Sequence, residues 1–295
     1  MIDLTFNSPE QETFFEPINK YGIRLYLKRD DLIHPFISGN KWRKLKHHLI
    51  KAEAAYKSHL VTFGGAFSNH LLATAAAGAK FNFKTTAFVR GEEANNQILD
   101  LCRLFGMDLI FVSREAYKHK EALYQSYFST HNTTFFIDEG GYSSDGELGC
   151  REIIKELEHT YNHIFCAAGT GATAAGIING NMEAKSPAAI NIVSALKGGE
   201  FLRDEINSLL KKTETYHLHT NYHFGGYAKT KPQLIAFIKN FTQQTGILID
   251  PVYTGKVLFA INDLAQKNYF EQNSKVLMVH TGGLFGILGM SEKFK

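Results

Sequence analysis

Short apolar segments alternate with helical patterns along most of this chain of 295 residues, and this alternation constrains the fold more than any other feature. Strand-like runs at residues 60–63, 85–89 and 109–112 are each followed by a segment with helical spacing. Strands that alternate with helices pair into a parallel sheet with right-handed crossovers. The first half of the chain therefore predicts a doubly wound α/β unit.

A second unit is expected beyond a polar, glycine-containing stretch. Residues 140–149 interrupt the alternation, so we predict a loop and a domain crossover there, followed by a helix at 152–161. The prediction is an α/β protein with two doubly wound, mostly parallel sheets. Residues 1–43 with 148–295 would form a large domain and residues 44–147 a small one. Ligands of such sheets bind in the crevice at the carboxyl ends of the strands.

Composition limits the possible partners. The net charge of +3 and the absence of a long basic block argue against nucleic acid, and no apolar run is long enough for a membrane span. The first 17 residues are acidic and lack the apolar core of a signal peptide. Cys102, Cys150 and Cys166 have no metal-ligand spacing and are expected to be reduced thiols. We therefore expect a cytoplasmic protein without a metal site.

In the segment Ser38-Gly39-Asn40-Lys41, a flexible turn leads directly into a predicted basic helix, and the lysine lies at the junction. A lysine forms a Schiff base with an aldehyde only when its amine is neutral, and nearby positive charge and burial both lower an amine pKa. Arg43 and Lys44 are expected to supply that charge. For an isolated lysine, the alternative is simply the solvated start of a helix. The acids before it, Asp30 and Asp31, are expected to form local ion pairs rather than a metal site.

Two glycine-containing turns follow predicted strands and open helices. In the first, Ser68, Asn69 and His70 would face an anion at a helix N-terminus, although Ser68 or Asn69 could serve only as a cap. In the second, glycines and threonines at 169–176 form a cup suited to a single phosphate. A dinucleotide site would require an acid at the end of the next strand, and that strand ends at Ala195-Leu196-Lys197.

A further turn, Asp250-Pro251-Val252-Tyr253-Thr254, also opens a predicted helix. Tyr253 could be an acid–base residue or a packing residue, and Thr254 could be only a helix cap. Near the end of the chain, a predicted strand likewise ends in a glycine-containing turn, His280-Thr281-Gly282-Gly283.

Together these motifs resemble the pyridoxal-phosphate (PLP) enzymes of the tryptophan synthase β-type fold, fold type II. The resemblance is to the branch containing D-cysteine desulfhydrase and 1-aminocyclopropane-1-carboxylate (ACC) deaminase, and it covers nearly the whole chain. It implies that the cofactor lies in the crevice between the two domains and is bound mainly by the large domain. It also implies that the enzyme is a homodimer that acts on a small amino acid.

The resemblance also implies roles for individual residues. Lys41 would carry the cofactor with Lys44 nearby, Asn69 would contact its phenolic oxygen, and Ser68, Asn69 and His70 would hold the substrate carboxylate. Tyr227 and Tyr253 would lie beside the substrate, and Thr254 would face the pyridine nitrogen. The implied phosphate cup consists of Gly169, Thr170, Gly171, Ala172 and Thr173. Leu72 stands where the family usually has an arginine.

The implied activity is a β-elimination that converts D-cysteine into pyruvate, sulfide and ammonia. The alternatives are ACC deamination, a dinucleotide-dependent oxidoreductase, and a non-catalytic binding protein. ACC has no α-proton, and the deaminases place a carboxylate at the pyridine nitrogen to deepen the electron sink. Thr254 is neutral, which favours elimination from D-cysteine.

Overall fold

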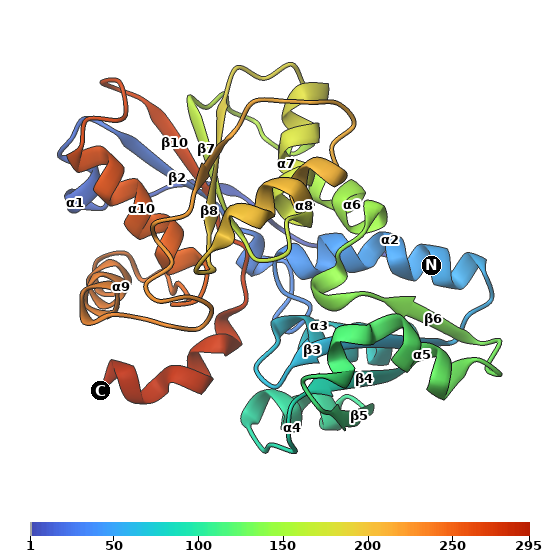
Figure 1. Cartoon of the computed structure of the whole chain (residues 1–295). Helices are drawn as coiled ribbons and strands as arrows, with labels where there is room; N and C mark the ends of the chain where they lie inside the picture. The colour runs from blue at the N-terminus through green and yellow to red at the C-terminus, as the bar shows by residue number, and fades with distance from the viewer. Residues whose placement is uncertain (1) are drawn as a thin grey trace.

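Two separate sheets organise the computed structural model, which describes residues 2–295 (Figure 1). The larger has six strands in the order β1-β2-β10-β7-β8-β9, and the smaller has four in the order β5-β4-β3-β6. Every pairing is parallel except that of the short edge strand β1 with β2. The expected α/β architecture with mostly parallel sheets is confirmed.

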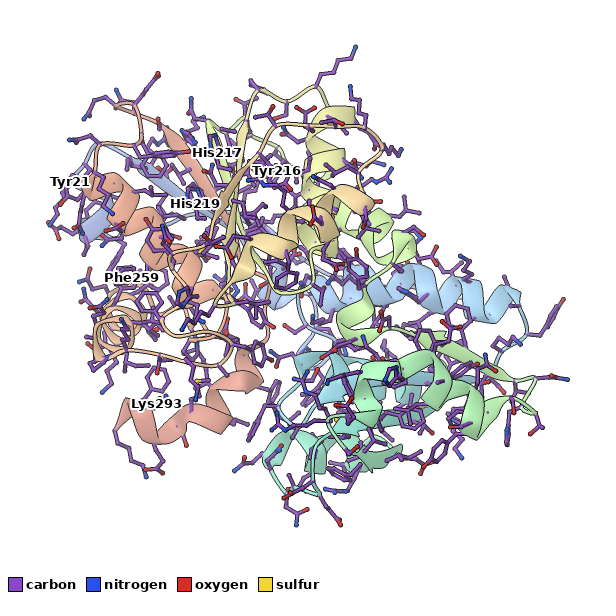
Figure 2. All side chains as sticks on the ribbon, viewed as in Figure 1. Tyr21, Tyr216, His217, His219, Phe259 and Lys293 are labelled. Atoms are coloured by element: carbon purple, nitrogen blue, oxygen red, sulfur yellow. The ribbon has the colours of Figure 1, made fainter. Side chains whose placement is uncertain are left out.

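The strands of the larger sheet come from both ends of the chain. They are β1 (Glu10–Glu12), β2 (Arg24–Lys28), β7 (His163–Ala168), β8 (Ala189–Ser194), β9 (His217–His219) and β10 (Lys275–Val279). Alternate residues of these strands enter two different cores, one under α9 (Pro232–Thr245) and α10 (Thr254–Gln266), the other under α6 (Ser144–Lys155) and α7 (Ala172–Glu183). This sheet is therefore covered on both faces, while Tyr216, His217 and His219 mark its β9 edge (Figure 2).

The smaller sheet is built from one continuous part of the chain. Its strands are β3 (His59–Gly65), β4 (Lys84–Arg90), β5 (Met107–Val112) and β6 (Thr134–Ile137). One face packs on α2 (Asn40–Ala54), α3 (Asn69–Phe81) and α4 (Gln97–Leu104), and the other on α5 (Lys120–Phe128). The division of the strands agrees with the expected small and large units, whose exact boundaries remain a prediction.

The remaining elements are short and lie mainly between the strands. They are α1 (Glu16–Asn19), α8 (Leu202–Ser208), η1 (Asp30–Leu32), η2 (Ala116–His119), η3 (Glu139–Gly141), η4 (Gly199–Phe201) and η5 (Leu284–Phe294). β1, α1 and the C-terminal η5 were not expected from the sequence. No helix among residues 2–295 is long and apolar enough to cross a membrane.

The expected loop at 140–149 is wrong in its second half, because α6 begins at Ser144 and ends at Lys155 rather than spanning 152–161. Ser143 caps this helix by accepting a hydrogen bond from the Gly146 amide at 3.0 Å. A Cβ on Gly149 would lie 1.9 Å from the Arg43 carbonyl oxygen of α2. Gly149 therefore permits close packing of α6 on α2 instead of breaking the helix.

Candidate active site

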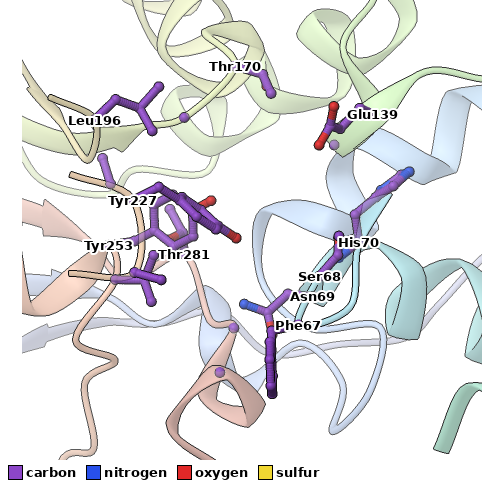
Figure 3. A pocket seen from close by; sticks show the side chains of 18 of the residues that line it. Phe67, Ser68, Asn69, His70, Glu139, Thr170, Leu196, Tyr227, Tyr253 and Thr281 are labelled. Atoms are coloured by element: carbon purple, nitrogen blue, oxygen red, sulfur yellow. The ribbon is translucent and has the colours of Figure 1, made fainter. Parts of the chain in front are cut away.

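A cavity of about 830 Å³ lies at the carboxyl ends of strands from both sheets (Figure 3). Most of the sequence-predicted site residues line it, as a group drawn from distant parts of the chain. They are Lys41, Lys44, Ser68, Asn69, His70, Gly169, Thr170, Gly171, Thr173, Tyr227 and Tyr253. Ala172 and Thr254 are absent from this lining. The cavity is large enough for a cofactor with a small substrate.

Lys41 is the second residue of α2, and a close backbone contact brings it to the cavity. Gly39, at the N-cap, has φ +62°, and a Cβ there would lie 1.9 Å from the Thr281 carbonyl oxygen. Asn40 donates a hydrogen bond to the Thr173 hydroxyl at 2.9 Å. Only glycine can make this approach without a clash. The turn is thereby fixed against both the Thr281 segment and the glycine-rich loop.

Burial, together with the smaller effect of the Lys44 charge, lowers the pKa of Lys41 to about 7. Lys44 is itself buried and donates to the Gly140 carbonyl at 3.0 Å. A large fraction of Lys41 is therefore a neutral, nucleophilic amine near neutral pH.

Arg43 does not contribute to this effect, contrary to the expectation from the sequence. Its guanidinium donates to Asp30 at 2.6 and 2.7 Å and to Glu156 at 2.8 Å. Arg43 is fully buried in this ion pair, so its charge is compensated locally. The expected pairing of the acids is confirmed, since Asp31 likewise pairs with Arg29 at 2.7 Å.

The glycine-rich loop ends at Gly171, the N-cap of α7, with φ +92°. The first amides of a helix have no partner within it and bind anions favourably. Thr170 and Thr173 add hydroxyl groups to the same lining. This arrangement fits the phosphate of the expected cofactor. Ala172 is packed in the core and does not line the cavity, so the structure does not bring it to the expected phosphate cup.

The Ser68-Asn69-His70 segment begins α3 and faces the cavity. Ser68 caps the helix, accepting from the His70 amide at 3.2 Å, and still lines the cavity. Burial holds the pKa of His70 well below its usual value, so its ring is neutral. His70 Nε2 lies 2.8 Å from the Thr62 hydroxyl, and its buried Nδ1 has no partner among the described residues.

Tyr227 and Tyr253 face each other edge to face, with ring centroids 6.1 Å apart. Both lie on the side of the cavity opposite His70 (Figure 3). Burial raises the pKa of both phenols, and the effect on Tyr253 is the larger. Both hydroxyls are therefore protonated at neutral pH and can donate to a ligand.

The structure does not bring Thr254 to the cavity, which corrects its expected position at the pyridine nitrogen. Its hydroxyl donates to Asp250 Oδ1 at 2.7 Å and accepts from the Asp250 amide at 2.8 Å. Asp250 also accepts from the Val252 and Tyr253 amides, which closes a tight turn before α10. Thr254 is fully buried in that turn, and Thr281 is the threonine that lines this side of the cavity.

Several charged residues in the lining were missed. Arg90 is the last residue of β4, Arg114 follows the neighbouring strand β5, Glu139 follows β6, and Lys293 lies on the C-terminal segment (Figure 2). Glu139 lies 3.9 Å from Arg90 and 3.6 Å from Lys120. Their positions after parallel strands were a usable signal, because such strand ends meet at one edge. Within residues 2–295, no cluster of three metal-ligating acids, histidines or cysteines is present.

Comparison with known proteins identifies a family whose cofactor fits the cavity described above. The family model described as pyridoxal-phosphate-dependent enzyme matches residues 13–282. A Thermotoga maritima protein, provisionally named 1-aminocyclopropane-1-carboxylate deaminase, is 30% identical and the match covers 99% of both chains. D-cysteine desulfhydrase of Yersinia pestis is 25% identical, with 96% of this chain and 93% of the relative covered.

A relative from Arabidopsis thaliana is named as a bifunctional D-cysteine desulfhydrase and ACC deaminase of the mitochondrion. It is 28% identical, with 90% of this chain and 74% of the relative covered. A crystal structure of an ACC deaminase homologue superimposes with a TM-score of 0.89 at 28% identity, covering 99% and 94% of the two chains. The chain therefore belongs to the pyridoxal-phosphate-dependent enzymes, in the family whose named members include ACC deaminases and D-cysteine desulfhydrases.

Proposed function

We propose that this PLP-dependent lyase acts on D-cysteine, with water as co-reactant, and releases pyruvate, hydrogen sulfide and ammonia. The observation that carries the proposal is the neutral amine of Lys41 in one cavity with two protonated tyrosines and an anion-binding helix start. The names of the Yersinia and Arabidopsis relatives support this substrate.

The protein's own residues would divide the work. Lys41 would hold the cofactor, and Asn69 would contact its ring. The phosphate would be held by Gly169, Thr170, Gly171 and Thr173. When bound, the cofactor supplies an electron sink for the bond broken at the substrate α-carbon.

Proton transfer would follow from the pKa values of the residues in the cavity. Lys41 Nζ, with a pKa of about 7, can accept the α-proton near neutral pH. The Tyr253 hydroxyl would donate a hydrogen bond to the departing thiolate, with Tyr227 beside it. The Ser68 hydroxyl, with Asn69 and the α3 amides, would bind the substrate carboxylate. The neutral ring of His70 would line the cavity beside the bound carboxylate.

The choice between D-cysteine and ACC depends on charge near the cofactor ring. ACC lacks an α-proton, and its ring opening needs a deeper electron sink. Glu139 is the single carboxylate among the described residues that line the cavity, and it lies near Arg90 and Lys120. On the Tyr253 side, Thr281 lines the cavity, and we infer that its neutral hydroxyl, instead of that of Thr254, would face the cofactor ring. This lining favours elimination of a good leaving group.

A direct competition between substrates tests the proposal. The holoenzyme would be assayed with D-cysteine, L-cysteine and ACC at equal concentrations, and pyruvate, 2-oxobutyrate and sulfide would be measured. We expect pyruvate and sulfide in equal amounts from D-cysteine and little 2-oxobutyrate from ACC. Faster turnover of ACC would replace the proposal with ACC deamination, and no turnover of any amino acid would favour a non-catalytic binding protein. The homodimer and the cytoplasmic location remain predictions.

A further inference from the structure

Lys256 is a buried lysine that none of the roles above uses. It is the third residue of α10 and only 1% exposed. Its ammonium donates to three main-chain oxygens, those of Ala195 at 3.0 Å, His223 at 2.9 Å and Gly226 at 2.9 Å. An ammonium has three donors, so this set satisfies all of them without a carboxylate. Such a site is costly to desolvate, which indicates a specific task for the charge.

The three oxygens belong to segments that carry residues of the cavity. Ala195 follows β8 and precedes Leu196, which lines the cavity. Gly226 directly precedes Tyr227. Lys256 itself lies one helical turn after Tyr253, at the start of the same helix. A single ammonium therefore joins the helix that presents Tyr253 to the loop that presents Tyr227.

The loop around Tyr227 has a backbone that needs support. Phe224 and Ala228 both have φ +53°, and Gly225 and Gly226 have φ +105° and +122°. Left-handed conformations at non-glycine residues are strained and persist only where surrounding contacts enforce them. Two of the three Lys256 hydrogen bonds end within this loop, at His223 and Gly226.

We propose that Lys256 is a positioning residue that holds Tyr227 beside Tyr253 by clamping the backbone of residues 223–226. The inference rests on the proposed function only in taking the tyrosine pair to act on substrate. Without the ammonium, two loop carbonyls lose their donors and the strained loop relaxes. Tyr227 then leaves its place opposite Tyr253, while α10 keeps Tyr253 at the cavity.

Hydrogen–deuterium exchange tests the clamp without any substrate. Lys256→Met keeps the length of the side chain and removes its three donors, and Lys267→Met is the control at the exposed end of the same helix. In the holoenzyme, we expect Lys256→Met to speed amide exchange within residues 223–228 at least about tenfold and Lys267→Met to leave it unchanged. If Lys256→Met folds poorly, Lys256→Gln, which keeps two donors, should give a smaller increase in the same segment. Unchanged loop exchange in both Lys256 variants would overturn the clamp.

A double-mutant cycle then tests whether Lys256 acts through Tyr227. Turnover would be measured for Lys256→Met, Tyr227→Phe and the double variant, with Lys267→Met as the control. We expect each single substitution to lower kcat at least about tenfold. The kcat of the double variant should be no more than about threefold below that of the less active single variant. Losses that multiply would overturn the link to Tyr227. A wild-type enzyme inactive on D-cysteine would contradict the proposed function and leave the exchange result to decide on the clamp.

Discussion

Arg43 donates to Asp30 at 2.6 and 2.7 Å, and neither side chain is exposed to solvent. Glu156 accepts from the other side of the same guanidinium at 2.8 Å. This buried network anchors the first turn of α2 to the segment that follows β2. It places Lys41 at the cavity while keeping the charge of its close neighbour in the protein interior.

Asp30→Asn should lower the free energy of unfolding by about 3 kcal/mol, because it removes one partner of a buried charge. Denaturant unfolding would measure the change. Glu16→Gln is the control, since Glu16 lies 3.7 Å from Lys20 with both side chains about half exposed, and it should cost less than about 1 kcal/mol. A loss for Asp30→Asn as small as that of the control would mean that the network does not stabilise the fold.

The lowered pKa of Lys41 predicts how the apoprotein captures pyridoxal phosphate at different pH values. Only the neutral amine attacks an aldehyde, so the rate should fall about tenfold per pH unit below about pH 7 and level off above it. An ordinary lysine, with a pKa near 10.4, would show no such plateau. Borohydride trapping and peptide mapping would follow the reaction. A rate that still rises at pH 9, or label on Lys44 instead of Lys41, would contradict the assignment.

Thr170 allows a test of the phosphate cup with matched variants. Thr170→Asp places a negative charge beside the α7 N-terminus, whereas Thr170→Asn has nearly the same shape without the charge. Repulsion should weaken cofactor binding in the Asp variant by at least about 1 kcal/mol, roughly fivefold, relative to the Asn variant. Titration of the apoprotein with pyridoxal phosphate would give both constants. Equal constants would remove phosphate binding from this loop.

Tyr253→Phe removes a hydroxyl from the cavity but keeps the ring. If this hydroxyl takes part in proton handling, kcat on D-cysteine should fall roughly 10²-fold or more. The control is Tyr269→Phe, because Tyr269 bonds Asn191 at 3.0 Å and lies outside the cavity lining. That variant should retain activity within about threefold. An equally small loss for Tyr253→Phe would assign Tyr253 to packing alone.

The sequence alone determined the α/β architecture and the segments that form the site, because strand–helix alternation and glycine turns are local patterns. The strands expected at residues 60–63, 85–89 and 109–112 lie within β3, β4 and β5, and Lys41 lies in the first turn of a helix that follows a glycine turn. Gly149 was expected in a loop but lies where α6 contacts α2, because a glycine in a loop and a glycine at a helix–helix contact look alike in sequence.

The tertiary structure decided which side chains face the cavity and which are used elsewhere. Arg43 and Thr254 lie next to site residues in the chain, but their side chains are held in the interior. Arg43 pairs with Asp30 and Glu156, and Thr254 donates a hydrogen bond to Asp250. Arg90 and Lys256 acquire their positions from strands and loops far away in sequence. Hydrogen bonds and ion pairs between distant segments set these orientations, and local sequence patterns carry no information about such partners.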